Sequence, residues 1–253
     1  MKQIPNLFTL LNLVFGCVAI VFILQTGETL LMLDGEGSWV PQLPEKIGWG
    51  AICIGIAAII DFLDGFIARL FKASSEMGKQ LDSLADVVSF GVAPGLILYQ
   101  LLRISYIQEE SGLDTSLWAF APALLFPCAG AWRLARFNLG KDTSADFQGL
   151  PIPAAGLVVA SLPLILFYDN LGLAGSLLNK WILYGIIILF AYLMTSKFRF
   201  IALKFNGAAN NRVPAVILLI VAIVSILFLH WTAVPVIFIV YTILSLISKK
   251  QPK

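Results

Sequence analysis

The chain has 253 residues, of which 59% are hydrophobic and only 13% are charged, and its formal net charge is +2. A soluble domain of this size carries about twice that share of charged residues, so the composition excludes an ordinary soluble protein. The small net charge also argues against a nucleic-acid partner. Apolar runs of about 20 residues recur along the chain, which is the length that crosses a ~30 Å hydrocarbon core.

Eight of these runs are candidate membrane-spanning helices. They cover about residues 5–25, 47–71, 79–102, 117–138, 151–169, 180–196, 212–230 and 232–248. The last two are separated by little more than His-Trp-Thr, which predicts a tight hairpin. The first run has no clear cleavage site after it, so we interpret it as a retained helix rather than a signal peptide. We predict an all-α, polytopic transmembrane bundle that forms a single domain over residues 1–253.

Basic residues gather on one side of this predicted bundle. With the N-terminus in the cytoplasm and eight alternating helices, 14 of the 17 basic residues fall in cytoplasmic segments, and only Lys46, Arg103 and Lys180 fall outside. Because cytoplasmic loops of membrane proteins carry an excess of Lys and Arg, both termini are expected to lie in the cytoplasm.

Four aspartates stand between the second and third runs, in the stretch DFLDGFIARLFKASSEMGKQLDSLAD. Asp61 and Asp64 are three residues apart and share one face of a helix, and Asp82 and Asp86 are four apart and share one face of the next. A short polar link makes the two helices antiparallel neighbours. The four carboxylates are therefore expected to converge at the cytoplasmic face.

Carboxylates inside a membrane span are costly, at about 2.5–3.5 kcal/mol each on insertion scales, and four together also repel one another. Protonation or bound divalent cations would relieve this cost. An all-oxygen set without His or Cys suits Mg²⁺ or Mn²⁺. Open coordination positions on such ions would leave room for phosphate oxygens.

The neighbouring residues fit a phosphate ligand. Gly65, Ala68 and Gly78 leave the helices without bulk next to the aspartates, and Arg69 can offer a bidentate fork to a phosphate. Ser74 or Ser75 could cap the start of the third helix, whose N-terminal end favours an anion.

The aspartate stretch matches the pattern D-x2-D-G-x2-A-R-x8-G-x3-D-x3-D at every fixed position. It resembles the signature of the CDP-alcohol phosphatidyltransferase family. The stretches IPNLFTLLNLVFG, SFGVAPG, RLARFN and GLPIPAAG further resemble phosphatidylserine synthases of bacteria and archaea. The resemblance implies a membrane enzyme that moves a phosphatidyl group from CDP-diacylglycerol to an alcohol and releases CMP, with L-serine as the expected acceptor and two divalent cations as cofactors.

The resemblance weakens after about residue 205, so it implies a catalytic core over about 1–205 and additional helices over about 206–253. It also implies a cytoplasmic membrane of the bacterial or archaeal type and roles for individual residues. Asp61, Asp64 and Asp82 are expected to bind metal, and Asp86 is expected to act as general base and to touch a second metal. The expected contacts to CDP-diacylglycerol are Asn6, Thr9, Gly65, Ala68, Arg69 and Gly78.

Serine carries a carboxylate at neutral pH, so its pocket should offer a cation. Arg133 and Arg136 are one turn apart near the cytoplasmic end of the fourth run, and Asn138 follows them. We expect at least one arginine to contact the acceptor carboxylate or a lipid phosphate. The alternative is that both only anchor the helix at the membrane surface.

Other interpretations stay open at this point. The same chemistry could use glycerol 3-phosphate or an inositol phosphate as acceptor, and a chain of another class, an ion-coupled transporter, could use the aspartates as an ion path. Gly91 and Gly95 form a small-xxx-small pattern that permits close helix contact within one chain or between two, and the resemblance implies a homodimer. The three cysteines lie in apolar runs and are expected to be free, buried thiols.

Overall fold

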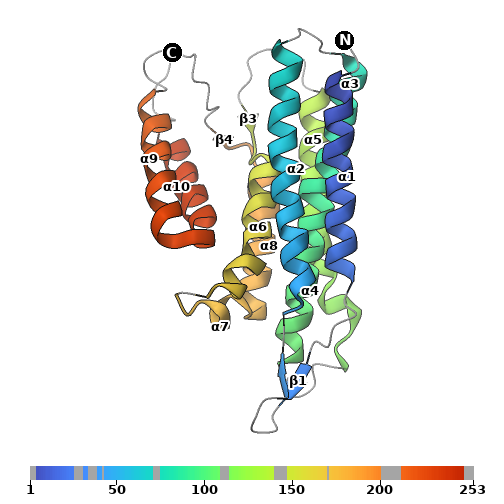
Figure 1. Ribbon diagram of the computed structural model, residues 1–253, viewed down its shortest axis with the longest axis vertical. Helices are drawn as coiled ribbons and strands as arrows, with labels where there is room; N and C mark the ends of the chain where they lie inside the picture. The colour runs from blue at the N-terminus through green and yellow to red at the C-terminus, as the bar shows by residue number, and fades with distance from the viewer. Residues whose placement is uncertain are drawn as a thin grey trace.

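A computed structural model of the chain describes residues 4–25, 31–33, 39–41, 43–70, 75–108, 114–139, 147–169, 171–200 and 212–247. The described residues are predominantly helical, as expected, and most helices run along one long axis (Figure 1). Two short antiparallel strand pairs depart from the all-α prediction. The pairs are β1 (Leu31–Leu33) with β2 (Trp39–Pro41), and β3 (Phe147–Gln148) with β4 (Arg199–Phe200).

Helices α1 (Ile4–Leu24) and α2 (Glu45–Leu70) form a long antiparallel pair. A Cβ added at Gly50 would lie only 2.6 Å from Cγ1 of Ile23, so the two helices approach closely where glycine removes the side chain. This pairing brings the start of α1 beside the end of α2, where two of the four aspartates stand.

The third predicted run is not one regular helix. It consists of α3 (Glu76–Asp86), a π-helical segment η1 (Val87–Val92) and α4 (Ala93–Ile107). The amide of Ala93 donates to the carbonyl of Val88, five residues earlier. Pro94 follows and has no amide hydrogen to donate, which disfavours a regular α-helical turn at this point. Such π-helical turns are frequent at functional sites, and this one begins directly after Asp86.

The fourth predicted run also begins irregularly. Its first part forms the 3₁₀ turns η3 (Leu117–Ala119) and η4 (Ala121–Leu124), and α5 (Leu125–Leu139) follows. Pro122 stands in the first turn of η4, where its missing amide hydrogen is tolerated. The α-helix is therefore shorter at its start than the predicted 117–138.

Apart from the short α7, which was not predicted, the remaining helices match the predicted runs closely. Pro151 caps α6, and Pro153 stands in its first turn. The turn η6 (His230–Thr232) joins the last two helices in the predicted hairpin, and His230 adopts a left-handed φ of 48° there. The helices are α6 (Ile152–Phe167), α7 (Ala174–Leu177), α8 (Lys180–Thr195), α9 (Arg212–Leu229) and α10 (Ala233–Ile247).

Within the described residues, four helical stretches are long and apolar enough to cross a membrane: 5–24, 45–70, 76–107 and 216–247, the last of which contains the α9–α10 turn. Helices α6 and α8 are apolar but shorter. Large apolar side chains are exposed on the outer faces of several helices, as a lipid-facing surface requires. Examples are Leu7, Ile59, Phe62, Trp132, Ile188, Leu227 and Phe228.

The core surrounds the π-helical segment. A Cβ on Gly156 of α6 would lie 2.8 Å from the carbonyl oxygen of Phe90, and one on Gly95 would lie 2.9 Å from Cδ of Pro127 on α5. A Cβ on Gly91 would lie 3.2 Å from Cδ1 of Ile152. The small-xxx-small pair thus packs inside one chain.

The cysteines are free, as predicted, but only Cys53 is buried. Cys17 and Cys128 are exposed, so the prediction of buried thiols was wrong for these two. An apolar run does not by itself place a side chain in the core, because in a membrane protein the outer face of a helix is apolar as well.

Candidate active site

The first part of the site forms where α1 and α2 pair. Thr9 is buried, and its hydroxyl lies 2.8 Å from Oδ2 of Asp64, to which it donates, and 3.2 Å from the carbonyl of Pro5 in its own helix. Asp64 is only 7% exposed. This contact holds one carboxylate in place and joins the start of α1 to the last third of α2.

The second part of the site is the start of α3. Ser75 is its N-cap and accepts a hydrogen bond of 3.0 Å from the amide of Gly78, as the sequence predicted for Ser74 or Ser75. Ser74 lies outside the described residues. A Cβ on Gly78 would lie 2.9 Å from Oδ1 of Asn6, so glycine allows α3 to approach α1. Asn6 therefore reaches the site, as expected.

Three of the four aspartates converge as predicted. Asp61, Asp64 and Asp82 each offer a carboxylate oxygen, and these oxygens all lie within 4.8 Å of one another. Asp61 and Asp82 are half-buried. Three carboxylates this close repel one another unless a positive charge stands between them. The set fits a hard divalent cation with oxygen ligands, such as Mg²⁺ or Mn²⁺.

Asp86 lies one turn further along α3 and is 8% exposed. It interacts electrostatically with the other three aspartates and with Arg133. Its Oδ1 has no hydrogen-bond partner in the described part of the chain. Arg133 comes from α5, is 5% exposed, and likewise has an Nε without a described partner. A buried carboxylate and a buried guanidinium with unused capacity therefore stand at the inner side of the cluster.

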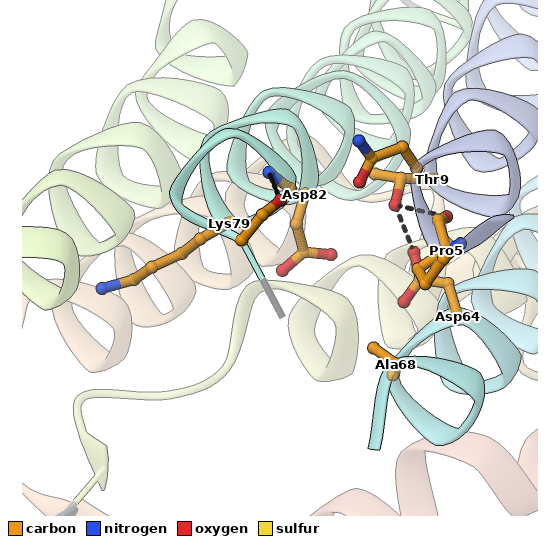
Figure 2. A pocket seen from close by; sticks show the side chains of 10 residues that line it. Pro5, Thr9, Asp64, Ala68, Lys79 and Asp82 are labelled. Atoms are coloured by element: carbon orange, nitrogen blue, oxygen red, sulfur yellow. Dashed lines mark hydrogen bonds between the residues drawn. The ribbon is translucent and has the colours of Figure 1, made fainter. Parts of the chain in front are cut away.

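A pocket of about 220 Å³ opens beside the aspartates. Figure 2 shows Asp64 and Asp82 turned toward it from opposite sides, while the amine of Lys79 points away and lies 5.8 Å from the ring centre of Phe137. A Cβ added at Gly65 would meet no atom within 4 Å, so this side of α2 is open. The pocket is lined by Pro5, Asn6, Thr9, Asp64, Gly65, Ala68, Ser75, Gly78, Lys79 and Asp82.

The structure brings most of the predicted substrate contacts together. Asn6, Thr9, Gly65, Ala68 and Gly78 all line this pocket. Arg69 follows Ala68 in the last turn of α2, and its side chain is exposed outside the pocket lining.

The predicted acceptor residues occupy different surroundings. The guanidinium of Arg136 donates to the carbonyls of Thr195 and Ser196, at 2.9 and 3.1 Å, and so ties α5 to the end of α8. Nδ2 of Asn138 donates to the hydroxyl of Ser83 at 2.9 Å, which ties α5 to α3. Of the three residues, Arg133 alone is buried and interacts with Asp86.

Sequence reasoning missed one buried polar residue near the cluster. Asn12 of α1 is 0% exposed, and its side-chain oxygen and nitrogen both lack a described hydrogen-bond partner. In the sequence it stands within an apolar run, three residues after Thr9. That spacing puts it on the same helix face as Thr9 and was the available signal.

Comparison with known proteins agrees with this geometry. The family model described as CDP-alcohol phosphatidyltransferase matches residues 2–195 of the chain. The match includes all four aspartates and the pocket, and it ends at the last residue of α8, before α9 and α10.

Individual relatives show which members of the family the chain is similar to. The chain is 34% identical over 200 residues to a CDP-diacylglycerol–serine O-phosphatidyltransferase of Helicobacter pylori, covering 78% of this chain and 70% of the relative. It is 29% identical over 215 residues to the enzyme of the same name in Bacillus subtilis, covering 83% and 96%. An archaetidylserine synthase of Methanothermobacter thermautotrophicus is 31% identical over 173 residues, covering 68% and 62%.

Proposed function

The chain belongs to the CDP-alcohol phosphatidyltransferase family, and we propose that it transfers the phosphatidyl group of CDP-diacylglycerol to the hydroxyl of L-serine, giving phosphatidylserine and CMP. The relatives named as serine O-phosphatidyltransferases support serine as the acceptor. The observation that carries the proposal is the convergence of Asp61, Asp64 and Asp82, with carboxylate oxygens within 4.8 Å of one another, beside a pocket that α1, α2 and α3 build together.

The same three aspartates would hold a divalent cation, and Asp86, which interacts electrostatically with all three, would serve a second one. When bound, two such cations would neutralise the diphosphate and make CMP a better leaving group. Mg²⁺ and Mn²⁺ both fit the all-oxygen donor set.

The pocket residues suit the nucleotide and diphosphate. Gly65 leaves the wall of α2 open, so a phosphate can approach the helix backbone there. The start of α3, capped by Ser75, presents its N-terminal amides to an anion. Asn6 supplies an amide side chain beside Gly78. Arg69, on an exposed turn next to the pocket, would reach a phosphate at its rim.

Asp86 is the proposed general base. Its free Oδ1 would take the proton of the serine hydroxyl. The hydroxyl oxygen would then form a bond to the phosphorus that carries diacylglycerol, and the bond from that phosphorus to the CMP phosphate oxygen would break. Arg133 would bind the serine carboxylate, because it is a buried cation next to this base. Arg136 and Asn138 bond to the end of α8 and to α3, as described above. These contacts favour a role in holding α5 in place beside the acceptor.

We further propose eight membrane crossings, with both termini and the active site on the cytoplasmic side. The starts of α1 and α3 and the ends of α2 and α5 lie at the same end of the bundle (Figure 1). Described basic residues at this end include Arg69, Lys79, Arg133 and Arg136, whereas Lys46, Arg103 and Lys180 stand in the opposite half. This asymmetry follows the positive-inside rule. A homodimer, which the family resemblance implies, is part of the same proposal.

An acceptor assay tests the activity. Purified protein in detergent should release CMP from CDP-diacylglycerol only when serine and Mg²⁺ or Mn²⁺ are both present, and a chelator should abolish the release. Glycerol 3-phosphate and inositol phosphate serve as rival acceptors in parallel reactions. Release that depends on one of these instead of serine would refute the acceptor, and no release with any acceptor would refute the transferase. An ion-transport role is disfavoured because the four aspartates cluster at one end of the bundle.

A further inference from the structure

Asn12 is a fully buried amide whose polar atoms are unused. Its side chain is 0% exposed, and neither Oδ1 nor Nδ2 has a hydrogen-bond partner among the residues that the structure describes. Buried polar groups in folded proteins are nearly always hydrogen-bonded, and an unsatisfied one destabilises the fold. An amide with two such atoms therefore indicates a partner outside the described residues, such as a bound ligand.

The pairing of α1 with α2 gives the position of Asn12. Thr9 is bonded to Asp64, and Gly50 packs against Ile23, so the two helices keep one antiparallel register along their length. Asn12 is one turn after Thr9, and Asp61 is one turn before Asp64. Asn12 thus stands level with Asp61, on the face of α1 that carries Thr9.

The packing of α1 on η1 places Asn12 relative to Asp86. The hydroxyl of Ser89 donates to the backbone carbonyl of Asn12 at 3.1 Å, and a Cβ on Gly16 would collide with Ser89. Asp86 is three residues before Ser89, so it also lies at about the level of Asn12. Arg133 interacts electrostatically with Asp86. Three buried residues, Asn12, Asp86 and Arg133, thus stand near one another with polar atoms that lack a partner among the described residues.

We propose that Asn12 is a specificity-determining residue that contacts the amino group of the acceptor. This inference rests on the proposed function, in which Asp86 takes the proton of the acceptor hydroxyl and Arg133 binds its carboxylate. The ammonium of the same amino acid then needs a hydrogen-bond acceptor. The Oδ1 of Asn12 is a neutral one, and it remains available while the aspartates hold cations.

Serine analogues test this assignment. 3-Hydroxypropionate lacks the amino group of serine, and ethanolamine lacks the carboxylate. A site built to bond a substrate N–H rejects an analogue without it by about 10³-fold or more in kcat/KM, so the wild-type protein should strongly prefer serine over 3-hydroxypropionate. Asn12→Leu, which keeps the number and branching of the side-chain heavy atoms and removes both polar atoms, should weaken this preference by at least about tenfold. Its preference for serine over ethanolamine should stay within about twofold of wild type, a change too small to reflect a lost hydrogen bond.

Two measurements separate this role from others. Binding of CDP with Mn²⁺ should be unchanged in Asn12→Leu, and Asn12→Ala repeats the analogue test if the leucine variant does not fold. The matched control is Ser161→Ala, which removes a buried hydroxyl of α6 that bonds only within its own helix. It should leave the preference as in wild type.

The possible outcomes are distinct. Unchanged preference for serine over 3-hydroxypropionate would overturn the assignment, as would an equal loss of CDP–Mn²⁺ binding, which would make Asn12 a metal-positioning residue. If the wild-type protein releases CMP with serine, the proposed function holds whatever Asn12 does. If it releases none, the proposed function fails first, and the assignment fails with it.

Discussion

The aspartate end of the bundle and the α9–α10 hairpin are both made of apolar helices, but they carry very different side chains. At the aspartate end, four carboxylates, Arg133 and Asn12 are buried or half-buried, and three of these residues have polar atoms without a hydrogen-bond partner among the described residues. After Arg212, the hairpin sequence through Ile247 contains no Asp, Glu, Lys or Arg. Large apolar residues such as Leu227 and Phe228 are mostly exposed there.

This difference separates two reasons for a residue to stand in a membrane helix. The hairpin residues are apolar because their side chains face lipid, and the hydrocarbon core favours any apolar side chain. At the aspartate end, charged side chains stand in membrane helices, where they are energetically unfavourable. Such a set of charges is retained only where a bound ligand compensates for its cost. The family model ends before the hairpin, at residue 195, which agrees with placing the chemistry in the first part of the chain.

The largest expected effect is at the aspartates. Asp61→Asn and Asp82→Asn each remove a charge from the cluster, and we expect serine-dependent CMP release to fall by about a thousandfold, because a lost metal contact costs several kcal/mol of transition-state stabilisation. The melting temperature should not fall, since each change also relieves repulsion. Asp114→Asn, an exposed aspartate away from the cluster, is the matched control. Near-normal activity in both cluster variants would mean that the carboxylates do not hold the catalytic cations.

Gly65 offers a smaller and more selective test. Its added Cβ meets no atom within 4 Å, so Gly65→Val should fold normally. The valine would instead occupy the space into which the substrate phosphate approaches. A steric penalty of about 1–3 kcal/mol would weaken CDP binding roughly 5- to 150-fold. Isothermal titration with CDP and Mn²⁺ measures this loss.

Gly185→Val on α8 is the control for Gly65, because its Cβ would also meet open space, far from the aspartates. Normal CDP binding by Gly65→Val would show that the substrate does not pass this face of α2.

Arg136 and Arg133 are one turn apart on α5. We expect Arg136 to stabilise the fold and Arg133 to bind the substrate. Arg136→Ala should lower the melting temperature by a few degrees, because two charge-assisted bonds to the end of α8 are lost at a partly exposed position, at a cost of about 1 kcal/mol. The KM for serine should change less than threefold, roughly 0.6 kcal/mol, because the guanidinium of Arg136 is bonded to the end of α8.

Arg133→Lys is the companion measurement. It keeps a positive charge but loses the guanidinium fork, so the KM for serine should rise by about tenfold, or 1.4 kcal/mol. A rise in the KM for serine in Arg136→Ala, with an unchanged melting temperature, would reverse the roles assigned to the two arginines.

The sequence predicted the aspartate cluster well because helical spacing and a short link suffice to put Asp61, Asp64 and Asp82 together. It also predicted a cap at Ser74 or Ser75, which the structure places at Ser75, and the turn at His230; both depend on local chemistry. It did not predict the π-helical segment after Asp86, since the missing amide of Pro94 can be accommodated in several ways and packing against Gly156 and Pro127 decides among them.

Asn12 was missed for a related reason. A lone amide in an apolar run is unremarkable until the register of α1 against α2 and η1 shows that both its polar atoms are buried. Arg136 looked equivalent to Arg133 in the sequence, because only the position of the α8 end distinguishes them. The roles of Asn12 and Arg136 both depend on packing between distant segments, and residue spacing along one helix carries no information about such packing.

The smallest expected effects are in the hairpin. Phe228 is 78% exposed and Leu227 is 69% exposed, so Phe228→Ala and Leu227→Ala should leave kcat and both KM values in detergent within about twofold of wild type, since exposed positions away from a site change little. Insertion into the membrane should survive as well, because many other apolar residues remain. A specific loss of serine-dependent activity in either variant would show that the hairpin takes part in the reaction, and that exposure to lipid is not the reason these residues are apolar.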